Sequence, residues 1–246
     1  MSNCTLCQLR EICLPAGMSQ QDVVRVAPLV RRRVRLVKRD TVYRSGEAVQ
    51  AVYAVRAGML KTHFISRNGR EKVAGFHLPG EIVGLDGLAS ATHPVSATAL
   101  EDSSLCEIPA EALRVRAGDI GALRQRLIAN FGESTGRDRE LAAMLSLMSA
   151  DERVTAFLLE LSARMFARGY AASAFRLRMT RDDIGSYLGL KLETVSRVLA
   201  RLAGAGLIAV QSRQIGLLDQ HALRAIADGT AQDIDRTSVA RVPGAS

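Results

Sequence analysis

Three of the four cysteines lie within ten residues of one another near the amino terminus. They are Cys4, Cys7 and Cys13, and the fourth is Cys106, far along the chain. Thiolates on a short segment can converge on a soft metal centre, because the backbone between them can bend. The first 60 residues contain no histidine. A self-contained zinc finger is therefore not expected, and Cys106 is the candidate for a fourth ligand.

Other uses of these thiols stay open from spacing alone. Cys4 and Cys7 form a CxxC pair that can act as a thiol–disulfide switch, and idle packing is a further alternative. A disulfide oxidoreductase is not expected, because its CxxC follows a strand in a βαβ unit and only three residues precede Cys4. Cys106 lies in a predicted strand, on the face opposite Leu105, and can point toward the amino-terminal segment or pack as a small buried residue.

A second candidate site is a predicted helix-turn-helix over residues 180–202. Thr180 can cap the first helix, with Asp183 three residues later at the positive helix end. Gly189 stands where a tight turn requires a positive φ. In the second helix the predicted inward stripe is Val195, Val198, Leu199 and Leu202, and the opposite face is Glu193, Ser196, Arg197 and Ala200. That face can enter a major groove.

Short β-type runs between Gly and polar turns occupy residues 34–108 and predict a sandwich or barrel. The expected strands are Val34–Val37, Thr41–Tyr43, Val52–Val55, Leu60–Ile65, Lys72–Phe76 and Ser104–Pro109. An Asn-Gly pair at residues 68 and 69 predicts a hairpin turn. The basic run from Arg31 to Arg39 is interpreted as a solvated edge.

Residues 119–148 are predicted to form one long helix with a heptad seam suited to a homodimer. The seam comprises Ile120, Arg124, Leu127, Phe131, Ser134, Asp138, Leu141, Leu145 and Met148. Gly132 and Gly136 weaken the helix, and two Asp138 carboxylates would approach each other in a parallel dimer. The alternative is an amphipathic helix packed on its own domain.

Ser149 and Glu152 form a predicted capping box that opens the next helix, so a domain boundary is expected near 148–150. Beyond the helix-turn-helix, two apolar runs flank residues 211–214 and predict a β-hairpin wing. Residues 230–246 are expected to be a frayed tail.

Composition narrows the class of protein. The 246 residues carry a net charge of +8, which favours an anionic partner such as nucleic acid. Neither a membrane span nor a secretory signal is evident, so a cytoplasmic location without membrane contact is expected. The four histidines are scattered without ligand spacing and no catalytic arrangement stands out, so an enzyme is not expected.

Residues 4–227 resemble the CRP/FNR family of bacterial transcription regulators, and within it the oxygen-sensing fumarate and nitrate reduction regulators. The motifs are Cys-x2-Cys-x5-Cys-x-Pro at Cys4 to Pro15, the segment Ala99–Pro109 around Cys106, and Arg181–Leu190 followed by Glu193–Arg197. The resemblance implies an α+β fold with a β-roll (a cyclic-nucleotide-binding-like jelly roll), a long dimerisation helix and a winged helix-turn-helix. The implied parts are a cluster-binding segment (1–18), the β-roll sensor (19–118), the dimerisation helix (119–148), the DNA-binding domain (149–229) and the tail (230–246).

In the oxygen sensors of this family the matching cysteines hold a 4Fe-4S cluster. The resemblance therefore implies that Cys4, Cys7, Cys13 and Cys106 are its ligands. It also implies that the intact cluster supports the DNA-binding homodimer and that its oxidation and loss dissolve the dimer. Structural zinc or a thiol–disulfide switch at the same cysteines is the alternative.

For DNA, the resemblance implies that Glu193, Ser196 and Arg197 read bases, with Thr194 and Arg181 beside them. Arg can bond to guanine, Glu to cytosine and Ser to either kind of edge. A palindrome related to TTGAT-N4-ATCAA and contact with RNA polymerase are implied in the same way. A cyclic nucleotide is not expected, because no Arg or Lys occurs from residue 82 to 105 to pair with its phosphate.

Overall fold

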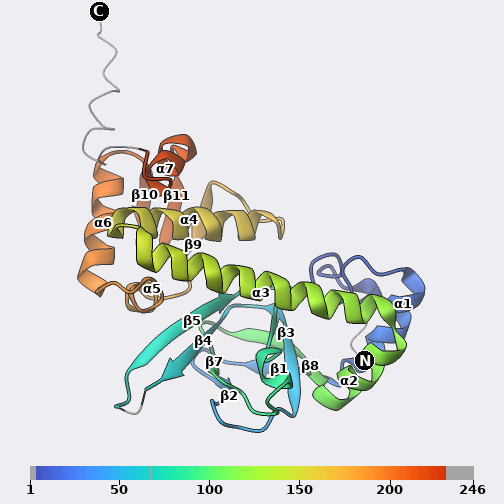
Figure 1. The fold of residues 1–246 in the computed structure, drawn as a ribbon. Coiled ribbons are helices and arrows are strands. Elements are labelled where there is room, and N and C mark those ends of the chain that lie inside the picture. The colour runs from blue at the N-terminus through green and yellow to red at the C-terminus, as the bar shows by residue number, and fades with distance from the viewer. Residues whose placement is uncertain (1–3, 67, 231–246) are drawn as a thin grey trace, which may run out of the picture. The chain divides into compact units, whose positions relative to one another are not determined.

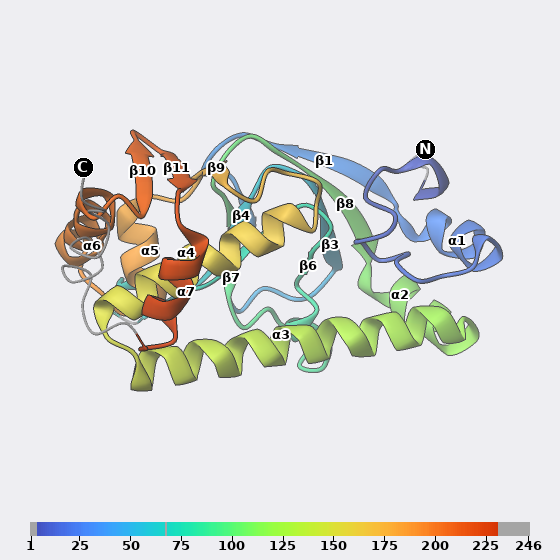
Figure 2. The same cartoon turned by 90° about the horizontal axis from the view of Figure 1, so that it is seen from above.

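The computed structural model describes residues 4–66 and 68–230. The chain divides into two compact units, residues 1–138 and 139–246, with the boundary inside the long helix α3. Figures 1 and 2 label the elements of both units. None of the described helices is long and apolar enough to cross a membrane.

Two antiparallel four-stranded sheets form the body of the first unit, as far as the structure describes it. Their strand orders are β1-β8-β3-β6 and β2-β7-β4-β5. The strands are β1 (Arg32–Leu36), β2 (Thr41–Tyr43), β3 (Ala51–Ala57), β4 (Leu60–Ile65), β5 (Glu71–His77), β6 (Ile82–Val83), β7 (Ser96–Ala99) and β8 (Ser103–Pro109). The position of β8 between β1 and β3 sets Cys106 opposite Arg33 on one side and Ala54 on the other.

Alternation along these strands creates two cores. The core between the sheets contains Tyr43, Val55, Leu60, Val83, Ala97, Ala99 and Leu105. The second core lies on the outer face of β3 and β8, where α1 (Gln20–Val26), α2 (Ala110–Asp119) and the start of α3 (Gly121–Leu147) cover the sheet. Cys106 packs against this second core, on the face opposite Leu105, as its strand pattern predicts.

The predicted single helix from 119 to 148 is wrong at its start. Ile120 has extended backbone (φ −119°, ψ 99°), and it separates α2 from α3. Its side chain is 1% exposed in the second core. Ile120 therefore cannot belong to a dimer seam, because its side chain is buried in the core of its own unit.

The second unit contains four helices and a three-stranded sheet besides the last turns of α3, counting its described residues. They are α4 (Ala150–Phe166), β9 (Ala174–Arg176), α5 (Arg181–Leu188), α6 (Leu192–Gly204), β10 (Ile208–Gln211), β11 (Gln214–Leu217) and α7 (Gln220–Ala227), with sheet order β10-β11-β9. The Ser149–Glu152 capping box is present, and the wing is confirmed as a hairpin pairing Gln211 with Gln214. Ser212, at φ +57°, makes its tight turn.

Several expectations differ from the structure or stay untested by it. Strands β6, β7 and β9 and helices α1, α2 and α7 are not among the elements predicted from the sequence, and none of them is longer than 10 residues. The β4–β5 hairpin is confirmed. The unit boundary at 138/139 lies ten residues before the expected 148–150. The five-part division stays a prediction, and residues 231–246 of the expected tail lie outside the described residues.

Candidate functional sites: a cysteine-lined cavity and a helix-turn-helix

The structure brings all four cysteines to one cavity in the first unit. Cys4, Cys7 and Cys13 line it from the amino-terminal segment and Cys106 lines it from β8, together with apolar side chains such as Val30 and Ile108. No three Cys, His, Asp or Glu side chains of the described residues are grouped as ligands of a single metal ion. The site combines donors that are about 90 to 100 residues apart in sequence, since Cys106 follows Cys13 by 93 positions.

Apolar anchors hold the amino-terminal segment against the cavity. Leu14 and Met18 are buried in the second core. Ile12 packs on Gly80, where a Cβ atom would lie 2.9 Å from Ile12 Cγ1 and where φ is +94°. Between Cys4 and Leu14 the backbone forms turns and a single 3-10 turn. The segment is therefore fixed at its carboxyl end, and its cysteine-bearing turns can shift more easily than a helix or strand.

Burial favours the protonated form of three thiols of this cavity, those of Cys4, Cys13 and Cys106. It raises the pKa of Cys4 to about 11 and the pKa of Cys13 to about 12, and the neighbouring cysteines act in the same direction. The pKa of Cys106 is also raised, mainly by burial, while the charges of Arg33 and Arg56 oppose the shift. Protonated thiols are poor nucleophiles, so these three cysteines lack the activated thiolate of a reactive cysteine.

The donor set fits an iron–sulfur cluster. Four sulfur ligands are the usual complement of a 4Fe-4S cluster, and most of the other side chains that line the cavity are apolar. Arg56 lines the cavity and Arg33 is opposite Cys106 in the β1–β8 register, so both place positive charge beside the thiolates that binding would create. The open volume of the cavity is about 30 Å³.

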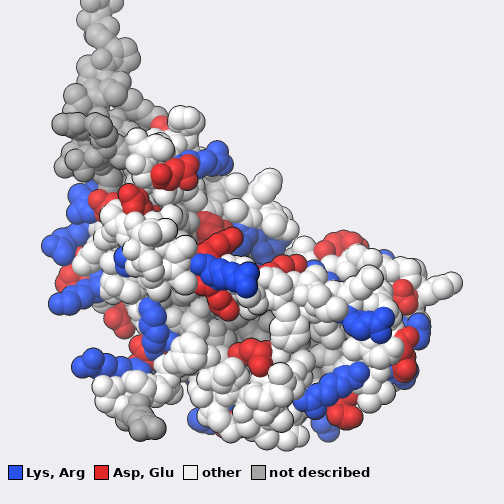
Figure 3. All heavy atoms as spheres, in the orientation of Figure 1, with Lys and Arg blue, Asp and Glu red and all other residues white. Residues whose placement is uncertain are grey.

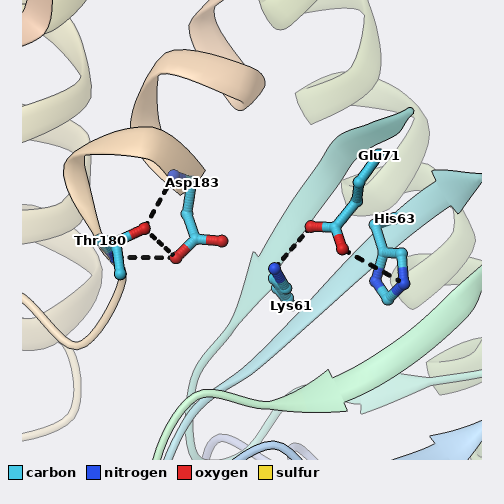
Figure 4. A network of polar contacts seen from close by, with 5 residues as sticks. All are labelled: Lys61, His63, Glu71, Thr180 and Asp183. Atoms are coloured by element: carbon cyan, nitrogen blue, oxygen red, sulfur yellow. Dashed lines mark hydrogen bonds and ion pairs between the residues drawn. The ribbon is translucent and has the colours of Figure 1, made fainter. Parts of the chain in front are cut away.

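The helix-turn-helix of the second unit is complete as predicted. Thr180 Oγ1 accepts from the backbone N–H of Asp183 at 3.0 Å, and Asp183 Oδ2 accepts from the backbone N–H of Thr180 at 2.8 Å (Figure 4). Gly189 ends α5 in the left-handed region, with φ +67°. The four predicted inward residues of α6 are between 0% and 2% exposed. Figure 4 also draws a separate network of the first unit, in which Glu71 pairs with Lys61 and His63.

The opposite face of α6 is open to solvent. Glu193 and Arg197 are exposed, and Thr194 and Ser196 are half-buried. Arg197 donates to Thr194 Oγ1 at 3.4 Å, and no Glu193–Arg197 ion pair occurs in this described part of the chain. Figure 3 shows Lys and Arg side chains along the edge where Figure 1 places α6. The face can therefore present both an acceptor and a bidentate donor to base edges.

A hollow beside this face lies between α5, α6 and the wing. Arg181 and Arg213 line it with Thr180 and Ser212, and its volume is about 320 Å³. Arg181 Nη1 donates to Ser196 Oγ at 3.2 Å, which ties the start of α5 to the outward face of α6. Two guanidinium groups at the rim suit contact with phosphate oxygens.

The α3 helix exposes an apolar face, but not the one expected throughout. Leu127 packs partly on the second core, and Leu145 Cδ2 would lie 3.3 Å from a Cβ on Gly189. Phe131 and Asp138 are exposed as predicted, and Ile128 and Leu147 are exposed as well. The exposed positions at heptad spacing are Ile128, Phe131, Thr135, Asp138 and Ala142.

Sequence reasoning missed several residues of these sites. Arg33 belongs to the basic run, which is exposed as expected, but its place opposite Cys106 follows only from the β1–β8 pairing. Leu192, 42% exposed at the start of α6, is available for an apolar base contact. Arg153 bonds three backbone carbonyls in the second unit. The sequence signal for Leu192 was its place one residue before Glu193, whereas Arg153 had none.

Comparison with known protein families assigns both halves of the chain. The model of the cyclic nucleotide-binding domain matches residues 33–115, and the model of the Crp-like helix-turn-helix domain matches residues 152–226. The first match covers most of the two-sheet body, and the second covers α4 to α7. The predicted α+β fold, with a jelly-roll domain followed by a winged helix-turn-helix, is therefore confirmed.

The relatives are named as regulators, and the similarity extends over nearly their whole length. The transcriptional activator protein Anr of Pseudomonas protegens is 42% identical over 231 residues, which cover 94% of this chain and 95% of Anr. An anaerobic regulatory protein of Haemophilus influenzae is 38% identical, covering 90% of this chain and 86% of its own. The solved structure of FixK2 from Bradyrhizobium japonicum has a TM-score of 0.74 at 31% identity, covering 79% of this chain and 96% of FixK2. The chain therefore belongs to the CRP/FNR family and is a DNA-binding transcriptional regulator.

Proposed function

We propose that this regulator responds to oxygen through a 4Fe-4S cluster held by Cys4, Cys7, Cys13 and Cys106. The observation that carries the proposal is that cysteines from two distant segments line one apolar cavity. Relatives named as anaerobic regulatory proteins support the same assignment. The bound cluster would supply a centre that oxygen can oxidise. The chain would supply four thiolates, a lining of mostly apolar side chains and the positive charges of Arg33 and Arg56.

We infer that the active form is a homodimer joined along α3. The exposed heptad face of Ile128, Phe131, Thr135, Asp138 and Ala142 supports this, because large apolar side chains in water favour a partner surface. This seam keeps Phe131 and Asp138 from the sequence prediction and leaves out Ile120 and Leu127, which pack in the second core. The other predicted members stay untested: Arg124, Ser134, Leu141, Leu145 and Met148. Two of the five seam positions, Thr135 and Asp138, are polar, which makes association weak. A few kcal/mol contributed by cluster binding can therefore shift the monomer–dimer population.

We also propose that α6 reads the bases of a palindrome related to TTGAT-N4-ATCAA. Arg197 would fork onto guanine, Glu193 would accept from cytosine and Ser196 would bond to either edge. Thr194 and Leu192 would lie beside them, and Arg181 would contact phosphate. Contact with RNA polymerase and a cytoplasmic location follow from the family resemblance.

A cyclic nucleotide is not part of the proposed function. The domain family carries its name from that ligand, yet residues 82–105 supply no Arg or Lys to neutralise a cyclic phosphate. Equilibrium dialysis against cyclic AMP should show no saturable binding. Tight binding would overturn this part of the proposal.

Anaerobic purification tests the cofactor directly. We expect a coloured protein that contains iron and inorganic sulfide, with an absorbance that bleaches in air. Metal analysis separates the alternatives. A colourless protein that contains zinc would establish the structural-metal alternative, and a metal-free protein with a Cys4–Cys7 disulfide would establish the thiol switch.

A further inference from the structure

The guanidinium of Arg153 lies at the junction of three helices of the second unit. Its Nε donates to the carbonyl of Met148 at 2.8 Å, and its Nη2 donates to the carbonyl of Leu145 at 2.8 Å. Its Nη1 donates to the carbonyl of Leu188 at 3.2 Å. Leu145 lies in the last turn of α3, Met148 directly follows that helix, and Leu188 is the last residue of α5. One side chain of α4 therefore joins the end of α3 to the first helix of the helix-turn-helix.

The three acceptors explain why an arginine stands here. Carbonyls in the last turn of a helix lack intrahelical partners and carry the negative end of the helix dipole. A guanidinium group presents several N–H donors in a rigid plane, whereas a lysine ammonium is a compact charge on a flexible stem. Only arginine can therefore hold all three carbonyls of the two helix ends in one fixed arrangement.

Close packing surrounds this junction. A Cβ on Gly189 would lie 3.3 Å from Leu145 Cδ2 and 3.7 Å from Arg153 Nη1, so the turn after α5 approaches α3 tightly. A Cβ on Gly185 would lie 2.6 Å from the carbonyl oxygen of Leu190, so α5 packs closely against the turn that leads into α6. An orientation fixed at the α5 end is consequently passed to α6.

A second tie reaches α6 from the same turn of α4. Asp151, two residues before Arg153, forms an ion pair with Arg201 of α6. The first turn of α4 thus contacts the end of α3 and both helices of the helix-turn-helix. Arg153 differs from this surface pair because its hydrogen bonds go to backbone atoms. A bond to the backbone fixes the position of the helix itself and does not depend on a second flexible side chain.

We propose that Arg153 is a positioning residue that sets which half-site spacing the regulator accepts. The inference rests on the proposed α3 dimer. In a two-fold dimer the seam fixes the axis, and the attachment of α6 to the end of α3 fixes how far apart the two reading faces lie. Loosening this attachment should leave each reading face intact but broaden the range of spacings that the pair can match.

The test uses the anaerobically purified full chain and three duplexes. Each carries the same two half-sites, separated by three, four or five base pairs, and binding is measured by fluorescence anisotropy. The variants are Arg153→Lys, which keeps the charge, and Arg153→Gln, which keeps some donors. The matched control is Arg224→Lys on α7, whose guanidinium bonds only to Gln220 of its own helix in the described contacts. Sedimentation and circular dichroism verify that each protein is dimeric and folded.

We expect wild type and Arg224→Lys to prefer one spacing. In Arg153→Lys the ratio of affinities for the preferred and the other spacings should fall roughly tenfold, because charge-assisted hydrogen bonds are lost. Affinity for all three duplexes falling by one common factor would overturn the proposal and leave Arg153 a stabilising residue only. An unchanged spacing preference would overturn it as well. Wild type that binds no duplex, or ignores the second half-site, would instead refute the proposed dimeric reading mechanism. If Arg153→Gln does not fold, the milder Arg153→Lys decides.

Discussion

The cysteine-lined cavity and the helix-turn-helix differ in what each needs before it can work. The helix-turn-helix has its cap, its left-handed turn and its buried stripe in place without any ligand. The cavity instead gathers four half-buried thiols, and burial raises the pKa of three of them, Cys4, Cys13 and Cys106. The proposed regulation therefore belongs with the cavity, where the proposed cluster would bind.

The largest expected effect comes from removing one sulfur ligand. Cys13→Ser should abolish the iron and sulfide content and, with it, DNA binding under anaerobic conditions, because a serine hydroxyl is a poor ligand for this soft centre. The matched control is Leu6→Ser in the same segment, where the side chain is 82% exposed and outside the cavity lining. Equal iron in Cys13→Ser and wild type would contradict the assignment of this ligand.

The next largest effect is expected from truncating a buried side chain of the helix-turn-helix. Leu199→Ala should lower the free energy of unfolding of the second unit by about 2–5 kcal/mol, because Leu199 is 2% exposed and its truncation leaves a cavity. DNA binding should weaken while the iron content stays at the wild-type level. Thermal denaturation and iron analysis measure the two effects. Leu218→Ala, at a side chain 62% exposed, is the control, and a parallel loss of iron in Leu199→Ala would argue against the separate roles.

A smaller effect is expected from the reading face itself. Arg197→Ala should cost ~1–3 kcal/mol of specific binding and relax the preference at one base pair, since a bidentate contact to guanine is lost. Binding to duplexes changed at each position of one half-site measures this. An equal loss on random duplex would show that Arg197 contacts phosphate and does not read a base.

The link between the two regions is tested at the α3 seam. Asp138→Ala should give a dimer that persists in air, because it removes a carboxylate pair whose repulsion is worth about 1 kcal/mol in water at close range. Asp138 also acts on Asp86 of its own unit, where it is one of the smaller causes of a raised pKa. Asp86→Asn removes that internal repulsion and serves as the control. An Asp138→Ala protein that sediments as a monomer without cluster would refute the repulsion argument.

The smallest expected effect is a pH dependence confined to the first unit. His93 is 3% exposed and stacks on Tyr43 at a centroid distance of 3.7 Å. Burial lowers the pKa of His93 below the ordinary value of a histidine, so the unfolded chain takes up a proton first as the pH falls. The stability of the first unit should therefore decrease as pH drops below about 6.5. His93→Phe should flatten this dependence and the exposed His221→Asn should not; equal slopes in all three proteins would contradict the assignment.

The two regions also differ in how far the sequence could predict them. The helix-turn-helix depends on contacts between near neighbours, such as Thr180 with Asp183 and the turn at Gly189, so its pattern was sufficient. The cavity depends on the β1–β8–β3 order, which no local pattern reveals. Cys106 could be assigned only by family resemblance and by the alternation of its strand.

The seam shows the limit of a period without tertiary contacts. A heptad starting at Ile120 fits the apolar spacing, yet the extended backbone at Ile120 and the packing of Leu127 on the second core turn that stripe inward. The exposed stripe through Ile128 and Phe131 shares the same period. Only the position of the core distinguishes the two.

The coupling of cavity to DNA is the central claim, and one air titration measures it most directly. Anaerobic protein on a labelled palindrome is exposed to stepwise oxygen while absorbance, sedimentation and anisotropy are followed together. We predict that bleaching, dimer dissociation and release of DNA coincide, and that Asp138→Ala bleaches without releasing DNA. Wild type that stays dimeric and DNA-bound after complete bleaching would contradict the account.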